Sequence, residues 1–242
     1  MFAEDEARLL TEAAGSPAEL AALAARRVAG EPLEFVLGWV EFAGLRLAVE
    51  PGVFVPRRRT QLLVAEALAV LRPDGVVVEL CCGVGAVGAA VLASRPDAEL
   101  HAVDVEPVAV RCARRNLGDR ARVYAGDLYA ALPDSVRGRV DVLVANAPYV
   151  PSEAIALMPP EARLHEPRIA LDGGPDGLDV HRRITAAAPD WLAASGQLVI
   201  ETSRVQAART AELASRAGLV PRVVRDEELD ATAVVAGRPL PT

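Results

Sequence analysis

A glycine-rich turn follows the apolar run 76–80, and a helical pattern begins directly after it. The turn reads Cys81-Cys82-Gly83-Val84-Gly85, and Gly88 completes a G-x-G-x-x-G spacing. In open α/β sheets, ligands bind at such carboxyl ends of strands. Glycines let the backbone approach a ligand, and free N–H groups at a helix start favour an electron-rich group. Taken alone, this spacing fits NAD as well as other nucleoside ligands.

Three carboxylates near the ends of successive expected strands narrow the choice of ligand. Glu79 lies next to the glycine turn, Asp104 ends the second strand, and Asp127 follows the third. Glu79 would repel a pyrophosphate and attract a ligand that carries an amino group and a sulfonium. Asp104 can accept from both ribose hydroxyls, and Asp127 can accept from the adenine amine. We therefore expect S-adenosylmethionine as the cofactor.

The fourth expected strand ends in a loop that can orient a planar nitrogen group: Asn146-Ala147-Pro148-Tyr149. The side-chain carbonyl of Asn146 and the backbone carbonyl of Ala147 could accept both hydrogens of an NH₂ group. That would aim the nitrogen lone pair at a methyl donor. An amide nitrogen is a poor nucleophile, so positioning and desolvation must contribute most of the rate. Pro148 stiffens the loop, and the Tyr149 ring can stack on a flat group.

Apolar runs and helical patterns alternate after residue 75, which predicts a parallel sheet with helices on both faces. Strands are expected at 76–80, 99–103, 122–124, 140–145, 197–201, 220–225 and 232–236, and the last two are close enough to pair antiparallel. Helices are expected at 60–71, 86–94, 107–116, 178–194 and 205–217. The predicted fold class is α/β, with a seven-stranded, mostly parallel sheet and an antiparallel last strand.

The N-terminal part has a different pattern. Residues 4–29 predict two short helices, which Gly15-Ser16-Pro17 separates, with Ser16 as the cap of the second. Residues 39–42 and 45–49 flank Ala43-Gly44 and predict a β-hairpin. We expect residues 1–50 to form a substrate-side segment and residues 51–242 to form the cofactor-binding domain.

Composition excludes several classes of function. The chain has 242 residues and a net charge of −7, and every basic residue is Arg, which argues against a nucleic-acid partner. Its one basic run, Arg57-Arg58-Arg59, fits a solvated helix start as well as a functional basic spot. The three cysteines and three histidines lack metal-ligand spacing, so we expect buried cysteines and no metal. There is no apolar run long enough to span a membrane, and the acidic N-terminus is unlike a secretory signal; we expect a cytoplasmic protein.

With these motifs the chain resembles the protein N(5)-glutamine methyltransferases that modify peptide-chain release factors. The similarity extends from about Gly30 to Pro239 and includes 31–38, 52–57 and the stretch His165-Glu166-Pro167-Arg168 to Leu178, which few other methyltransferases carry. It implies a Rossmann-like class I methyltransferase that acts on a glutamine side chain of a release factor. It also implies roles for individual residues: cofactor binding by Glu79, Cys81, Cys82, Gly83, Val84, Gly85, Asp104, Val105, Asp127, Leu128 and Asn146, catalysis by Asn146, Pro148 and Tyr149, and substrate binding by Asn146, Ala147, Pro148, Tyr149, Phe54 and Arg57.

Departures from the family pattern lie on the substrate side. Ala147 stands where the family usually has a second proline, and 58–61 replaces an acidic pair. The N-terminal helical region is short. Other functions therefore stay open: methylation of a nucleobase exocyclic amine or of a small-molecule amine or amide, an NAD-type oxidoreductase, and a binding module without catalysis.

Overall fold

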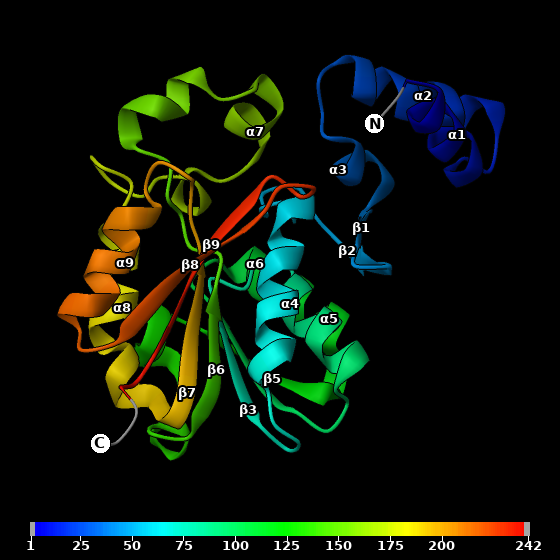
Figure 1. Cartoon of the computed structure of the whole chain (residues 1–242). Helices are drawn as coiled ribbons and strands as arrows, with labels where there is room; N and C mark the ends of the chain where they lie inside the picture. Colours follow the sequence, from blue (N-terminus) through cyan, green and yellow to red (C-terminus); the bar gives the residue numbers. More distant parts are fainter. Residues whose placement is uncertain (1–2, 240–242) are drawn as a thin grey trace.

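A computed structural model describes residues 3–239, and its main feature is a seven-stranded sheet between two layers of helices (Figure 1). The strand order is β5-β4-β3-β6-β7-β9-β8. The last strand, β9, is antiparallel to both of its neighbours, and the other neighbouring pairs are parallel. The predicted sheet is therefore confirmed. Its strands are β3 (Val76–Leu80), β4 (Glu99–Asp104), β5 (Ala121–Ala125), β6 (Val140–Ala145), β7 (Leu192–Glu201), β8 (Val220–Asp226) and β9 (Ala231–Gly237).

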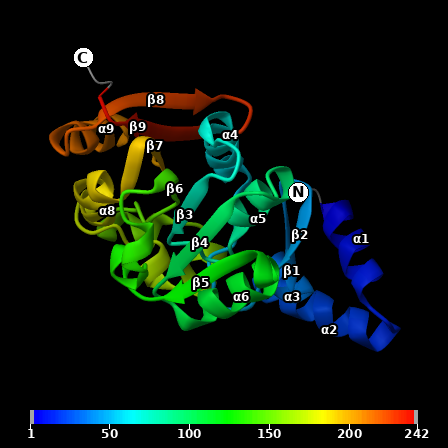
Figure 2. The same ribbon diagram turned by 90° about the horizontal axis from the view of Figure 1, so that it is seen from below.

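Two hydrophobic cores lie on opposite faces of this sheet (Figures 1 and 2). The first is covered by α4 (Gln61–Val70), α5 (Ala86–Ser94) and α6 (Pro107–Leu117), and the second by α8 (Asp179–Trp191) and α9 (Ala207–Arg216). Successive strand residues point to opposite faces. Val77 accordingly packs into the first core, whereas Val76 and Val78 pack into the second. A strand buried on both faces must be apolar throughout, which explains the continuous runs in the sequence.

The N-terminal part begins with α1 (Ala3–Ala13) and α2 (Pro17–Val28), as predicted. The Ser16 side chain accepts from the N–H of Glu19, which confirms the predicted cap. A short helix that the sequence analysis missed, α3 (Leu33–Leu37), completes a small separate core with α1 and α2. The predicted hairpin, β1 (Trp39–Phe42) and β2 (Leu45–Ala48), packs its apolar side chains into the core beneath α4 to α6. The division of the chain at residue 50 stays a prediction.

Two sequence predictions of local structure need correction. The helix expected at 178–194 ends at Trp191, because Leu192 already pairs with Val140 of β6 and begins β7. Pairing to the sheet thus overrides the helical preference of the alanine-rich segment. The segment 152–170 also contains structure that was not predicted, namely η5 (Ser152–Leu157), α7 (Pro160–His165) and η6 (Arg168–Ala170). Within residues 3–239, the structure has no helix long and apolar enough to span a membrane.

The close packing of Gly88 in α5 generates a test of the fold. A Cβ at Gly88 would lie 2.6 Å from Leu100 Cδ2 and 2.7 Å from Glu79 Oε2. Alanine favours a helix by about 1 kcal/mol over glycine, but overpacking a core costs about 1–3 kcal/mol. Because both neighbours are buried, we expect the steric cost to win. In urea titrations, Gly88→Ala should lower the free energy of unfolding by about 1 kcal/mol.

The matched control is Ser94→Ala, an exposed position at the end of the same helix. It should change the free energy of unfolding by no more than about 0.5 kcal/mol. A Gly88→Ala protein at least as stable as the parent would contradict the packing described here.

Candidate functional site

A cavity of about 370 Å³ lies where the loops after β3, β4, β5 and β6 converge. Its volume falls in the range of small-molecule sites. The four loops come together because the strands are parallel, so their carboxyl ends share one edge of the sheet. Most of the predicted site residues line the cavity: Phe54, Glu79, Cys81, Cys82, Gly83, Val84, Asp104, Val105, Asp127, Leu128, Asn146 and Pro148. Four do not: Arg57, Gly85, Ala147 and Tyr149.

The glycine turn owes its shape to left-handed backbone angles. Cys81, Gly83 and Gly85 have φ values of +54°, +55° and +76°. Of the two glycines, Gly83 has open space beside it: a Cβ placed there would have Phe54 O, at 4.0 Å, as its nearest neighbour. A ligand can therefore approach the backbone at Gly83, whereas Gly85 is crowded by Leu117 and shapes the turn. Cys81 adopts a conformation that costs a non-glycine residue about 1–2 kcal/mol.

Two of the predicted acids also hold the turn in place. Glu79 belongs to β3 itself, is 4% exposed, and accepts from the N–H groups of Val87 and Gly88 at 3.3 and 2.9 Å. Asp104 accepts from the N–H groups of Gly83 and Glu106 at 2.8 and 2.9 Å. The N–H donors lower the pKa of both carboxyls, but burial has the larger effect. It raises the pKa of Glu79 to about 8 and also raises the pKa of Asp104. A cation that enters the cavity would favour the ionised form of both carboxyls.

The titratable side chains in the cavity wall are mostly acidic. Of the five, only Arg183 is basic, and the others are Glu79, Asp104, Glu106 and Asp127. With its raised pKa, Glu79 is largely protonated at neutral pH until a cation binds beside it. Arg183, from α8, donates to Asp127 Oδ2 at 2.5 Å. Both partners of this pair are more than half exposed, so it adds little stability. Asp127 Oδ1 remains for a ligand, and the predicted adenine contact stays a prediction. Glu106 and Arg183 are wall residues that the sequence analysis missed, since neither lies in a motif.

The amide of Asn146 is held by Thr60, which also lines the cavity, and through it by Glu201, which does not. Its Nδ2 donates to Thr60 Oγ1 at 3.2 Å, and Thr60 Oγ1 donates to Glu201 Oε2 at 2.7 Å. Thr60 ends η1 (Arg58–Thr60), and Glu201 ends β7. Among residues 3–239, Asn146 Oδ1 has no hydrogen-bond partner, and the residue lines the cavity. The oxygen is thus available to a substrate.

Tyr149 lies behind the loop. Its hydroxyl donates to Glu201 Oε1 at 3.1 Å and accepts from Arg59 Nη2 at 2.9 Å. Burial raises the pKa of Tyr149 to about 12, so the hydroxyl keeps its proton at neutral pH. Because the residue does not line the cavity, its predicted stacking on the substrate has no support in the geometry and stays a prediction.

Of the two interpretations of the basic run, the solvated helix start does not hold for Arg57 and Arg59. Arg57 Nη2 lies 2.7 Å from both oxygens of Glu166, whose side chain is 1% exposed, and Arg59 pairs with the equally buried Glu201. Only Arg58 is exposed. The Arg57 guanidinium also lies over the Phe54 ring, 4.9 Å from its centroid. Arg57 therefore connects the linker beside the cavity to the segment after α7.

The family-specific stretch up to Leu178 packs against the loop that contains Asn146. A Cβ at Gly173 would lie 2.8 Å from Pro148 O, and a Cβ at Gly177 would lie 2.3 Å from Tyr149 O. The two glycines are thus required by close contact with the loop.

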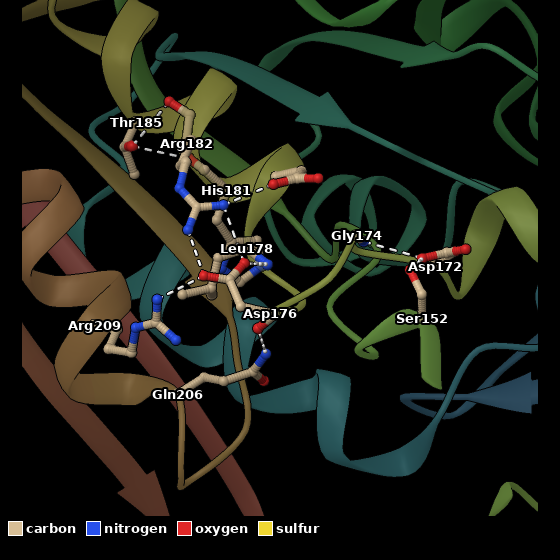
Figure 3. Close-up of polar contacts among 11 residues, drawn as sticks. Ser152, Asp172, Gly174, Asp176, Leu178, His181, Arg182, Thr185, Gln206 and Arg209 are labelled. Atoms are coloured by element: carbon tan, nitrogen blue, oxygen red, sulfur yellow. Dashed lines mark hydrogen bonds and ion pairs between the residues drawn. The ribbon is translucent and has the colours of Figure 1, made fainter. Parts of the chain in front are cut away.

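Asp176 organises the end of this stretch. It accepts from Arg182 and Arg209, and its backbone oxygen accepts from Gln206 (Figure 3). Gln206 also donates to the backbone oxygen of Tyr149.

Asn116 of α6 is a further residue that the sequence analysis missed. Its side chain accepts from Ala48 N and donates to Ala48 O and Val84 O, at 2.8 to 2.9 Å. It therefore ties the hairpin to the glycine turn. An Asn near the end of a helix is common, so the sequence carries no signal for this contact.

Two of the three cysteines are buried, as the sequence predicts. Cys82 and Cys112 are buried, and Cys81 is half-buried in the cavity wall. No group of three or more His, Cys, Asp or Glu in this part of the chain could hold a metal ion.

Comparison with known proteins agrees with this geometry. Residues 44–174 match the family described as "Methyltransferase small domain". Release factor glutamine methyltransferases of Geobacter sulfurreducens and Mycolicibacterium smegmatis are 38% and 40% identical; the alignments cover 92% and 86% of this chain and 80% and 75% of those proteins. A solved methyltransferase from Pyrococcus furiosus has a TM-score of 0.60 at 16% identity, over 88% of this chain and 96% of that one, which shows the shared fold. The resemblance seen in the sequence is confirmed: the chain belongs to the release factor glutamine methyltransferase family and is a methyltransferase with a Rossmann-like fold.

Proposed function

We propose that the protein transfers a methyl group from S-adenosylmethionine to the side-chain amide nitrogen of a glutamine in a protein of the release-factor type. The carrying observation is the position of Asn146, which offers a free amide oxygen to an anionic cavity at the carboxyl edge of the sheet. The names of the relatives supply the acceptor, a glutamine of a release factor.

The cavity residues fit this cofactor. An amino group and a sulfonium would meet a wall with four acids, and Gly83 leaves room for close backbone approach. Asp104 and Asp127 keep free acceptor capacity for ribose hydroxyls and an adenine amine. A dinucleotide would instead bring its pyrophosphate into a wall that includes Asp104, Glu106 and Asp127, which is unfavourable. When bound, S-adenosylmethionine supplies an activated methyl group.

The chain's own residues orient the acceptor. Asn146 Oδ1 accepts one hydrogen of the glutamine NH₂, and the backbone carbonyl of Ala147, a residue outside the cavity wall, is proposed to accept the other, which fixes the plane of the amide. Phe54, Pro56 and Pro148 give this part of the wall an apolar surface that excludes water. As the nitrogen gains the methyl group, the carbon–sulfur bond of the donor would break and S-adenosylhomocysteine would leave. The nitrogen would lose one proton to solvent, so the uncharged methylamide is the product. Orientation and desolvation are the main contributions to the rate.

A protein acceptor is favoured by apolar side chains beside the cavity. Leu157, Leu164 and Ile169 are 87%, 67% and 50% exposed, all within the segment 152–170, and Ile169 also lines the cavity. Exposed apolar side chains next to a site are typical of surfaces that bind a macromolecule. The net charge of −7 disfavours a nucleic acid.

Removal of the Asn146 amide tests the proposed mechanism. Asn146→Ala deletes the acceptor that holds the substrate NH₂, so kcat/KM for the protein substrate should fall at least about tenfold, or ~1.4 kcal/mol. The measurement is methyl transfer at saturating S-adenosylmethionine. An unchanged unfolding midpoint serves as the control for folding. A loss smaller than tenfold in a folded variant would contradict the mechanism.

The identity of the cofactor is tested by calorimetry with two ligands. S-adenosylhomocysteine should bind at least about tenfold more tightly than NAD, because only NAD brings a pyrophosphate into the anionic cavity. The opposite order of affinity would favour the oxidoreductase alternative.

A substitution that introduces a charge tests whether the segment 152–170 contacts the protein substrate. Leu164→Asp places a carboxylate among the side chains proposed to contact the protein substrate, and KM for that substrate should rise about threefold or more. The affinity for S-adenosylhomocysteine should stay the same, since Leu164 does not line the cavity. The matched control is Val220→Asp on β8, an exposed valine at the edge of the sheet. Equal values of KM in both variants would count against this surface.

A further inference from the structure

We infer that Glu201, acting through Thr60, determines which end of the Asn146 amide faces the substrate. The inference rests on the proposed function and adds to it two positioning residues, neither of which belongs to the catalytic loop. It concerns the direction of the hydrogen bonds rather than their number.

The three side chains form a short chain that starts at the cavity and ends in the core. Ala145 and Ile200 are paired in the parallel strands β6 and β7, so Asn146, directly after β6, lies beside Glu201, the last residue of β7. Thr60 lies between their side chains, 3.2 Å from Asn146 Nδ2 and 2.7 Å from Glu201 Oε2. Thr60 is 3% exposed and Glu201 is 2% exposed, so water does not replace either contact.

The carboxylate fixes the direction of each bond. Glu201 forms an ion pair with Arg59, with 3.1 Å between Arg59 Nε and Oε1, and an ionised carboxylate can only accept. The single hydroxyl proton of Thr60 is therefore given to Oε2. Toward Asn146, Thr60 can then only accept, so Asn146 must present its NH₂ to Thr60. The amide oxygen faces the cavity as a result.

The opposite direction would disable the site. If Thr60 donated to Asn146, the Asn146 NH₂ group would face the substrate NH₂, and two donors cannot bond to each other. Glu201 itself does not line the cavity. Its effect on the substrate therefore passes through Thr60 and Asn146, which makes it a positioning residue.

Arg59 is one of the residues at which the sequence departs from the family pattern, and it orients Glu201. It stands within 58–61, where the family usually has an acidic pair. Its Nε donates to Glu201 Oε1, and its Nη2 donates to the Tyr149 hydroxyl, which also donates to Oε1. Arg59 and Tyr149 thus share one carboxylate oxygen and leave the other to Thr60.

Glu201→Gln is the direct test, because it keeps the shape and changes only the direction. Arg59 and Tyr149 both donate to one oxygen, so the glutamine keeps its carbonyl there and turns its NH₂ to Thr60. The glutamine NH₂ offers the Thr60 proton no acceptor, and Thr60 is buried, so the proton should pass to Asn146, whose amide then reverses. Because the reversed amide also opposes the substrate NH₂, we expect kcat/KM to fall at least about tenfold, with the affinity for S-adenosylhomocysteine changed by less than about twofold.

Two variants of Thr60 test the central residue of this series of hydrogen bonds. Thr60→Val removes the hydroxyl without changing the side-chain shape and should lower kcat/KM as much as Glu201→Gln does. Thr60→Ser keeps the hydroxyl and should retain most of the turnover. Thermal unfolding and S-adenosylhomocysteine binding check that each variant is folded. Equal turnover in the Val and Ser variants would overturn the inference even if Glu201→Gln did not fold.

A double variant distinguishes an effect of hydrogen-bond direction from an effect of side-chain packing. In Asn146→Asp the new carboxylate can only accept, and Thr60 has no proton left for it. Adding Glu201→Gln reverses the direction of the hydrogen bonds. Thr60 can then donate to one oxygen of the new carboxylate at position 146, and the other oxygen accepts from the substrate. We expect the second change to restore kcat about fivefold or more over Asn146→Asp, a non-additive result. Additive losses would overturn the inference.

These outcomes are distinct from failure of the proposed function. If Asn146→Ala keeps full activity, the proposed mechanism is wrong. If Asn146→Ala is inactive while folded Glu201→Gln turns over like the parent, the mechanism stands and the inference is wrong.

Discussion

The parallel register of β3, β6 and β7 is the constraint on which the site depends. Ala145 pairs with Leu80 on one side and with Ile200 on the other. The residues that follow, Cys81, Asn146 and Glu201, therefore lie at one edge of the sheet, the last of them as the end of β7. A slip of one residue in β6 would turn its buried side chains to the wrong core and move Asn146 away from the glycine turn. Stability and function thus require the same pairing.

Buried carboxylates then fix the segments around that edge. Glu79, Glu166 and Glu201 are at most 6% exposed, and each accepts hydrogen bonds from a segment distant in the sequence or from a helix start. Removing a carboxylate from water costs several kcal/mol unless donors compensate for it. Each acid therefore fixes the position of its donors. Glu79 binds the first turn of α5, Glu166 binds the linker beside the cavity, and Glu201 binds Thr60, which supports the Asn146 loop.

Local pattern was sufficient to predict the sheet, most helices and the loops that carry the cavity, because parallel pairing brings strand ends together whatever lies between them. It was insufficient for contacts between distant segments. Arg59 and Glu201 are 142 residues apart, and Asn116 meets the hairpin from the end of a helix. No motif marks such partners, since three-dimensional packing alone decides them. The basic run could not be assigned from the sequence for this reason: the charges of Arg57 and Arg59 are compensated by buried acids that lie far along the chain.

The central claim, methylation of a glutamine side chain, is tested most directly by the identity of the labelled product. The purified protein and S-adenosylmethionine with a tritiated methyl group are added to a lysate of the source organism. The account predicts label in a release factor, on a glutamine side chain, which acid hydrolysis releases as labelled methylamine. Label in nucleic acid or in a small molecule, or no transfer at all by a protein that binds S-adenosylhomocysteine, would contradict it.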